Sequence, residues 1–153
     1  IQSVASQQYL LLGKFWPAIK IYLAYTFNIL KMKIKIFCNE VEMEAELENT
    51  PTAKEIYKLL PLDGAANRWG DEIYFVIPVR VDAEKDATDI VEKGDVAYWP
   101  EGSCFCIFFG KTPESTDEEI KAASKVNVFG KIVGDATVFK IVKNGDLIIV
   151  EKG

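Results

Sequence analysis

Residues 33–48 alternate between apolar and polar side chains, and this pattern constrains the fold more than any other feature of the chain. The apolar and acidic members of its second half are Val41, Met43, Ala45, Leu47, Glu42, Glu44, Glu46 and Glu48. Because successive side chains of a strand point to opposite faces, the pattern predicts two half-buried strands joined by a turn at Asn39. The glutamates are then expected to face solvent and the apolar side chains a core.

The chain after residue 48 contains further short stretches of strand composition. These are residues 71–81, 94–100, 104–110, 126–133, 137–142 and 146–152. Asn144 and Gly145, between the last two, predict a tight hairpin turn. Many short strands separated by turns are typical of a closed antiparallel barrel or a sandwich, so the sequence predicts a mainly β fold.

Two short helices are expected between these strands. In the first, over residues 49–61, Thr50 is suited to the N-cap, Pro51 to the first helical position and Pro61 to the stop. In the second, over residues 115–124, Ser115 and Glu118 have the spacing of a capping box.

Residues 1–31 differ in composition from the remainder, since they hold three lysines and none of the 23 acidic residues. Their apolar run is about as long as a membrane-spanning helix, which needs about 20 residues, but Lys14, Pro17 and Lys20 interrupt it. No cleavage site of a secretory signal precedes Met32. We expect one domain over residues 32–153, preceded by a segment, 1–31, that is disordered or an artefact of the assigned start.

Composition excludes several classes of function. The chain has no histidine, which removes His-based nucleophilic catalysis and His-based zinc sites. Its net charge of −5 argues against nucleic-acid and anionic-membrane partners. Three cysteines without a disulfide framework favour a reducing, cytoplasmic setting. No phosphate-loop, dinucleotide or metal-site motif is present, so no cofactor and no metal is expected.

Three stretches resemble signature motifs of the cyclophilins, the prolyl isomerases. They are "YFVIPVRV" from residue 74, "GSCFCIFFGKTP" from residue 102 and "KVNVFGKIVGD" from residue 125, which resemble HRIIPGFM, GSQFFI…KT and KHVVFGKV. In length, and in "RWGDEIYF" and "GDVAYWP", the chain from Met32 is most similar to small prokaryotic cyclophilin-like proteins of unassigned function. The resemblance implies a closed barrel of about eight antiparallel strands with two helices, and implies no activity.

The residues that serve the isomerases are not retained in this comparison. The arginine that hydrogen-bonds the prolyl amide falls on Phe75, and the phenylalanine that packs on the proline ring falls on Arg80. The glutamine and second phenylalanine of GSQFF fall on Cys104 and Cys106, and the histidine falls on Val126. An isomerase needs a donor to the amide nitrogen, which Phe75 cannot supply, so the resemblance implies little or no isomerase activity.

Candidate binding residues lie in the loop before the first cyclophilin-like motif, in the three motifs, and in the stretch GDVAYWP between the first two. They are Arg68, Trp69, Glu72, Tyr74, Phe75, Trp99, Cys104, Cys106 and Asn127. Aromatic side chains with a polar tip suit a pocket wall, and loops on a rigid barrel commonly carry binding groups. The alternative is structural: the tryptophans fill the barrel, and Arg68 and Glu72 form a surface ion pair.

Cys104 and Cys106 are two positions apart on an expected strand, so both side chains face the same side. They are interpreted as small buried fillers, with ligand lining and redox or metal chemistry as the alternatives. Asn127 has a structural alternative too, since it can satisfy backbone groups where the chain enters its strand.

Two hypotheses of function follow. The first is a non-catalytic binding module that holds a small molecule or an extended peptide in a remodelled groove. The second is an enzyme, either a weak or atypical prolyl isomerase or a carboxylate-based activity that uses Glu72 or Asp95.

Overall fold

The structure, a computed structural model, describes residues 17–23 and 31–153. The chain divides between Lys31 and Met32 into two units. In the first unit residues 17–23 form a helix. The expectation that residues 1–31 are disordered or artefactual falls mostly outside the described residues and stays a prediction. Within the described ranges, no helix has both the length and the apolar character needed to span a membrane.

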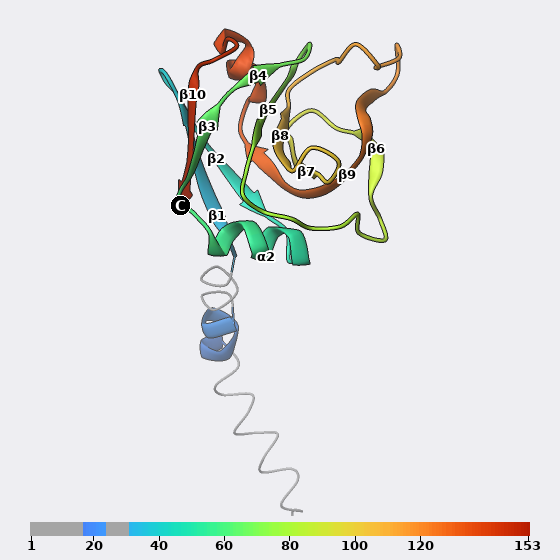
Figure 1. Ribbon diagram of the computed structural model, residues 1–153. Coiled ribbons are helices and arrows are strands. Elements are labelled where there is room, and N and C mark those ends of the chain that lie inside the picture. Colours follow the sequence, from blue (N-terminus) through green and yellow to red (C-terminus); the bar gives the residue numbers. More distant parts are fainter. Residues whose placement is uncertain (1–16, 24–30) are drawn as a thin grey trace, which may run out of the picture. The chain divides into compact units, whose positions relative to one another are not determined.

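Residues 32–153 fold mainly as antiparallel strands (Figure 1). The strands are β1 (Lys33–Cys38), β2 (Val41–Leu47), β3 (Leu62–Ala65), β4 (Asn67–Arg68), β5 (Glu72–Val76), β6 (Thr88–Val91), β7 (Asp95–Trp99), β8 (Cys104–Phe108), β9 (Ile120–Val133) and β10 (Leu147–Lys152). The helices of this unit are α2 (Pro51–Lys58) and a 3₁₀ helix, η1 (Ala136–Ile141). The mainly β prediction is therefore confirmed.

The strands form one curled sheet in the order β3-β10-β1-β2-β9-β7-β8-β5-β4, and β6 pairs with β9 beside this path. The two end strands, β3 and β4, are consecutive in the chain and are separated only by Ala66. The sheet therefore curls until its ends meet at one residue (Figure 1). No ladder of hydrogen bonds joins β3 to β4 among the described pairings. The structure therefore supports a curled antiparallel sheet, and closure of the expected barrel is not confirmed.

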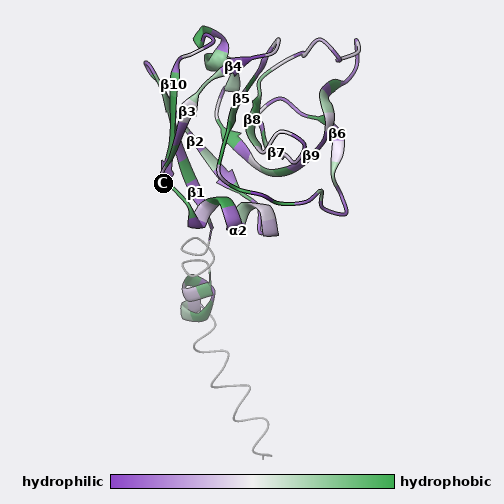
Figure 2. Cartoon of the chain, in the orientation of Figure 1, coloured by the Kyte–Doolittle hydropathy of each residue, from purple (hydrophilic) through white to green (hydrophobic). Residues whose placement is uncertain are grey.

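The main core lies inside this curled sheet. Its aromatic centre combines Phe75, Phe105 and Phe129, with ring centroids 5.3 and 5.4 Å apart in successive pairs. Tyr98 is fully buried among them and donates its hydroxyl to the Val79 carbonyl oxygen at 2.6 Å. In Figure 2 hydrophobic and hydrophilic colouring both occur along the strands and along α2, as expected for elements that bury one face.

The first part of the domain follows the sequence prediction closely. β1 and β2 pair around Asn39, which adopts a left-handed φ of 53°. Thr50 caps α2 by accepting a hydrogen bond from the Ala53 N–H at 3.1 Å, with Pro51 in the first turn. Both expectations are confirmed.

The second predicted helix, over residues 115–124, is wrong. The Thr116 hydroxyl accepts the Glu119 N–H at 3.0 Å as a cap would, but the Thr116 N–H bonds back to the Glu119 carbonyl and closes a single turn. From Ile120 the chain is already strand β9. Its continuous pairing with β6, β7 and β2 outweighs local helix signals.

Three further expectations need correction. Residues 137–142, predicted as a strand, form most of η1, which Asp135 caps through the Thr137 N–H. The turn at Asn144 and Gly145 is present, with a φ of 90° at Gly145, but it joins η1 to β10 instead of two strands. The strand expected over 71–81 ends at Val76. The short strands β3, β4 and β6 were not predicted.

Candidate functional site

A pocket of about 220 Å³ opens on the outer face of the sheet. It lies between strands β5, β8 and β7 on one side and the start of β9 on the other. The residues that line it are Trp69, Glu72, Tyr74, Trp99, Cys106, Ala122, Ala123 and Val126. Five of the nine predicted site residues are therefore in one place, although they come from three separate segments of the sequence.

Strand register explains why these side chains converge. Tyr74 on β5 and Ala97 on β7 are both paired with Cys106 on β8, and Trp99 is paired with Cys104. Paired residues of neighbouring strands project to the same face. This outer face carries a second apolar cluster, separate from the main core, and the pocket lies over it.

Trp69 reaches the pocket from the turn between β4 and β5. Trp69 and Glu72 exchange backbone hydrogen bonds of 3.0 and 3.2 Å across Gly70 and Asp71. Gly70 has a φ of 62°, the left-handed value that a two-residue II′ hairpin turn needs at this position. A Cβ atom there would also lie 2.8 Å from the Lys111 carbonyl oxygen. The turn is therefore tightly fixed, and so is the Trp69 backbone.

Arg68 does not line the pocket but holds this turn in place. Its guanidinium donates to the carbonyls of Gly70, Lys140 and Val142 at 2.8–2.9 Å. It also lies 3.3 Å from the carboxylate of Asp71 and over the ring of Phe109. The alternative of an Arg68–Glu72 surface ion pair is wrong, because Asp71 is the partner and Glu72 is buried.

Trp99 is held by three neighbours. Its Nε1–H donates to the Ser124 hydroxyl at 2.7 Å, which ties β7 to β9. Its ring meets the Tyr74 ring edge to face, with centroids 6.5 Å apart and planes at 77°. A Cβ atom at Gly102 would overlap the Trp99 ring, so the glycine gives the ring its space.

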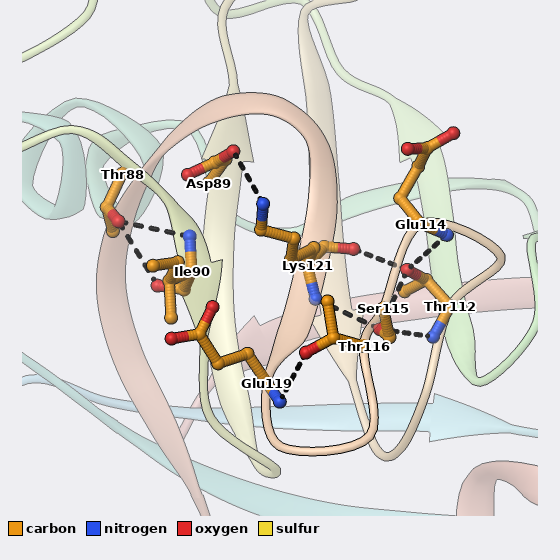
Figure 3. Close-up of polar contacts among 9 residues, drawn as sticks. All are labelled: Thr88, Asp89, Ile90, Thr112, Glu114, Ser115, Thr116, Glu119 and Lys121. Atoms are coloured by element: carbon orange, nitrogen blue, oxygen red, sulfur yellow. Dashed lines mark hydrogen bonds and ion pairs between the residues drawn. The ribbon is translucent and has the colours of Figure 1, made fainter.

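The pocket wall formed by β9 is held by the loop before it (Figure 3). Ser115 accepts hydrogen bonds from the N–H groups of Thr112 and Lys121, at 2.9 and 3.0 Å. The Thr112 hydroxyl donates to the Lys121 carbonyl, and the Lys121 ammonium lies 4.0 Å from Asp89 on β6. These contacts fix the first residues of β9, so Ala122 and Ala123 form a defined wall.

Glu72 is the one charged residue that lines the pocket, and it is 6% exposed. Burial raises the pKa of its carboxyl to about 7, while a hydrogen bond from the Cys106 thiol acts in the opposite direction. No lysine or arginine of the described residues forms an ion pair with it. The carboxyl therefore takes up or loses a proton near neutrality.

The cysteines are buried, unbridged thiols. Burial raises the pKa of both Cys104 and Cys106, and the Glu72 carboxylate adds to the effect. Cys38 belongs to the main core and the other two to the outer cluster. No group of three or more metal-ligating side chains occurs in the described part of the chain. The arrangement fits the interpretation of small fillers beneath the pocket.

The structure places the remaining predicted residues outside the pocket lining. Phe75 is fully buried in the main core, because it alternates with Tyr74 on β5. Tyr74 is the side chain of this strand that lies at the pocket beside Cys106. Cys104 lies beneath Trp99 in the outer cluster.

Asn127 is buried, and its side chain forms hydrogen bonds with other parts of the fold. Its side-chain oxygen accepts the Glu84 N–H at 2.8 Å, and its NH₂ group donates to Asp82 and Thr52 at 2.9 and 3.1 Å. It thereby joins β9 to the 82–84 loop and to α2. Asn127 does not line the pocket, and its role in binding stays a prediction.

Sequence reasoning missed Ala122 and Ala123 as pocket residues. They were placed in a helix, and small side chains carry no chemical signal of their own. The strand pattern that continues from Val126 back through Ala122 and Ile120 at even spacing was the available signal.

Comparison with known proteins agrees with this fold. The cyclophilin-like family profile matches residues 32–151. A hypothetical protein of Archaeoglobus fulgidus, solved in solution, has 43% sequence identity and a TM-score of 0.69, over 81% of this chain and 96% of that chain. No curated protein matches the chain in sequence. The curled antiparallel sheet, the match over nearly the whole second unit and the similarity to an archaeal protein together show that this chain belongs to the cyclophilin-like family.

Proposed function

We propose that the domain is a non-catalytic binding module, and that its ligand occupies the pocket between Trp69, Tyr74 and Trp99. The observation that supports this most is the convergence of these three aromatic side chains on one buried carboxyl group, Glu72. Ligand sites are commonly concave and apolar, with a few placed polar groups and a titratable residue of shifted pKa.

The size of the pocket favours a small ligand or a single side chain of a peptide. About 220 Å³ corresponds to the volume of about seven water molecules in the liquid. An extended peptide would have to place one group in the pocket and lie across the neighbouring surface. The pocket is formed by fixed elements, so it is available before the ligand arrives.

Prolyl isomerase activity is not supported by the pocket lining. Such an enzyme must hold a twisted amide and donate a hydrogen bond to its nitrogen. The lining contains no arginine, lysine or side-chain amide. Arg80, the position that matches the proline-packing phenylalanine, lines a different hollow with Val81 and Ser103. The three free thiols support a reducing compartment, and we propose a cytoplasmic location.

A ligand screen by NMR on the full chain tests the proposal. The indole N–H signals of Trp69 and Trp99, assigned with Trp69→Phe and Trp99→Phe variants, report on the pocket walls. We expect at least one class of small fragment to shift both signals, and Ala123→Leu to weaken that binding, whereas the conservative Ala123→Ser does not. If no fragment shifts either signal at millimolar concentration, the binding proposal is wrong.

An isomerisation assay on an Xaa-Pro peptide tests the alternative. The uncatalysed barrier is about 18–20 kcal/mol, so even a modest catalyst is detectable at high protein concentration. We expect no acceleration. Acceleration that Glu72→Gln or Tyr74→Leu abolishes would assign the pocket to catalysis instead.

A further inference from the structure

We infer that the pocket is an aromatic cage for a methylated ammonium group, with Trp69, Tyr74 and Trp99 as the cage and Glu72 as the counter-ion. This inference rests on the proposed binding function and names the chemical class of the ligand. The pocket would accept either a free quaternary amine or a methylated lysine side chain, since both present a methylated ammonium group.

The three rings come from three different elements and line the same pocket. Trp69 lies on the β4–β5 turn, Tyr74 on β5 and Trp99 on β7. The near-perpendicular arrangement of Tyr74 and Trp99, at 77°, gives walls of different orientation instead of a flat stack. Aromatic faces attract cations, tryptophan most strongly, and surrounding a cation with several rings is how proteins recognise quaternary ammonium groups.

Glu72 determines the charge of the ligand that the pocket favours. The pocket lining contains one carboxyl group and neither lysine nor arginine. No ion pair of Glu72 with a basic side chain occurs among the described residues. A buried carboxylate without a cation is costly, and a ligand cation that enters the pocket removes that cost. At pH 8, where the Glu72 carboxyl is mostly ionised, an anionic ligand would meet repulsion from this group.

The scarcity of hydrogen-bond acceptors favours a methylated over a primary ammonium. A primary ammonium carries three N–H donors that all need acceptors once it is desolvated. Besides Glu72, the polar atoms of the lining side chains are two indole N–H groups, one phenol and one thiol. The Trp99 indole N–H is already bonded to Ser124. Methyl groups need no acceptor and pack on ring faces and on Ala122 and Ala123.

The test compares a cation with its neutral counterpart on the full chain at pH 8. Choline and 3,3-dimethylbutan-1-ol have the same shape, and only choline is charged. We expect choline to bind at least tenfold more tightly by calorimetry and to shift the indole signals of Trp69 and Trp99. Glu72→Gln should weaken choline at least tenfold and leave the alcohol within twofold, while Glu42→Gln, on the exposed face of β2, changes neither.

The pH dependence provides a second readout that a structural role would not produce. Because the pKa of Glu72 lies at about 7, choline affinity should rise about tenfold from pH 6 to pH 8. The other titratable side chains near Glu72 are the thiols of Cys104 and Cys106 on β8 and the carboxyl of Asp71, which forms an ion pair with Arg68. Burial raises the pKa of both thiols above the ordinary value, so the thiols stay uncharged between pH 6 and pH 8. In Glu72→Gln the pH dependence should disappear.

Each possible result decides between the two proposals. If the alcohol binds as tightly as choline, or if screened fragments bind and choline does not, the cation cage is wrong and the binding module stands. If choline, the alcohol and every screened fragment fail to bind, both proposals are wrong. Choline binding that is insensitive to Glu72→Gln and to Tyr74→Leu would place the cation elsewhere and overturn the cage.

Discussion

The two faces of the sheet formed by β5, β8 and β7 are made by the same strands and differ in what they hold. The inner face presents large side chains, Phe75, Phe105, Ile107 and Tyr98, all fully buried. At the level of the pocket the outer face presents the small residues Ala97, Cys104 and Cys106, with Tyr74 and Trp99 packed against them. The ring of Phe108, which is paired with Glu72, is fully buried on this face. Large residues fill the inner space, whereas several small residues of the outer face lie beneath the pocket.

The comparison teaches how one curled sheet can keep a pocket on one face while its other face supplies most of the apolar burial. The inner face supplies the apolar burial that stabilises the fold. The outer face can then keep an unfilled volume and a buried carboxyl, both of which cost stability. Cysteine serves this face as a small apolar residue, and both of its positions here depart from the isomerase motif GSQFF.

The largest difference between the two faces should appear in the free energy of unfolding when one side chain of each face is truncated to alanine. Phe105→Ala should lower the free energy of unfolding by about 3–5 kcal/mol, because it removes a fully buried ring from the inner core. Cys106→Ala on the outer face should cost about 1 kcal/mol or less, since few atoms are lost. Urea denaturation of both variants checks this. Equal losses would mean that the outer face carries as much of the stability as the inner one.

The pH dependence of stability should come mainly from the outer face. A carboxyl whose pKa is 4.5 when unfolded and about 7 when folded binds more protons in the folded state between these values. Stability therefore falls as the pH rises from 4.5 to about 7, by up to about 3 kcal/mol, and is level above. Glu72→Gln should remove most of this slope and raise stability at pH 8.

Denaturation curves at pH 5 and pH 8 measure this effect. The pKa of Asp95 is also raised by burial, so a smaller slope of the same sign should remain in Glu72→Gln. An unchanged slope in that variant would show that Glu72 is ionised at neutral pH without cost.

Asn127 offers a way to separate the two faces along one strand. It follows the pocket residue Val126, but its side chain bonds to the 82–84 loop and α2. Asn127→Ala leaves buried partners unpaired and should cost about 2 kcal/mol of unfolding free energy. Asn49→Ala, at an exposed position, should cost almost nothing. A direct role of Asn127 in binding would instead appear as lost affinity with stability unchanged.

The smallest effect on stability is expected where the pocket has room. Ala123→Leu should change the free energy of unfolding by no more than about 0.5 kcal/mol, because the side chain is exposed at the pocket wall. Ala45→Leu, in the packed inner core, should cost about 1–3 kcal/mol by overpacking. Thermal melts of the pair check this, and a similar cost for both would mean that the pocket wall is as tightly packed as the core.

The fold was predictable from sequence where one strong local pattern decided it. The alternation in β1 and β2 and the capped start of α2 are such patterns. The prediction for segment 115–124 failed because the Ser115–Glu118 capping box does not form. Ser115 instead accepts from the N–H groups of Thr112 and Lys121, Thr116 and Glu119 close a turn, and the following residues pair as β9. Short strands such as β4, with two residues, have too little sequence to show any pattern.

The candidate site was predictable from sequence only for residues whose side chains are typical of binding sites. The aromatic residues and Glu72 stood out by type, and the structure brings them to one pocket, where their role in binding stays a prediction. Phe75 was expected to line the pocket, but its side chain lies in the main core, and the preceding residue, Tyr74, lines the pocket instead. Ala122 and Ala123 could not be singled out from the sequence, because they contribute only small side chains that leave space for the pocket.

Strand β9 has a consequence for how the pocket can respond to a ligand. Its first residues form the pocket wall, and its last residues pair with β2 and β7 around the main core. A slip of β9 by one residue would turn its inward side chains outward along the whole strand, so the wall cannot slide to adjust its width. A ligand would therefore be accommodated by rotation of the Trp69 and Tyr74 side chains, since the Trp99 indole is bonded to Ser124. Amide exchange in residues 128–133 should not depend on whether the pocket is filled.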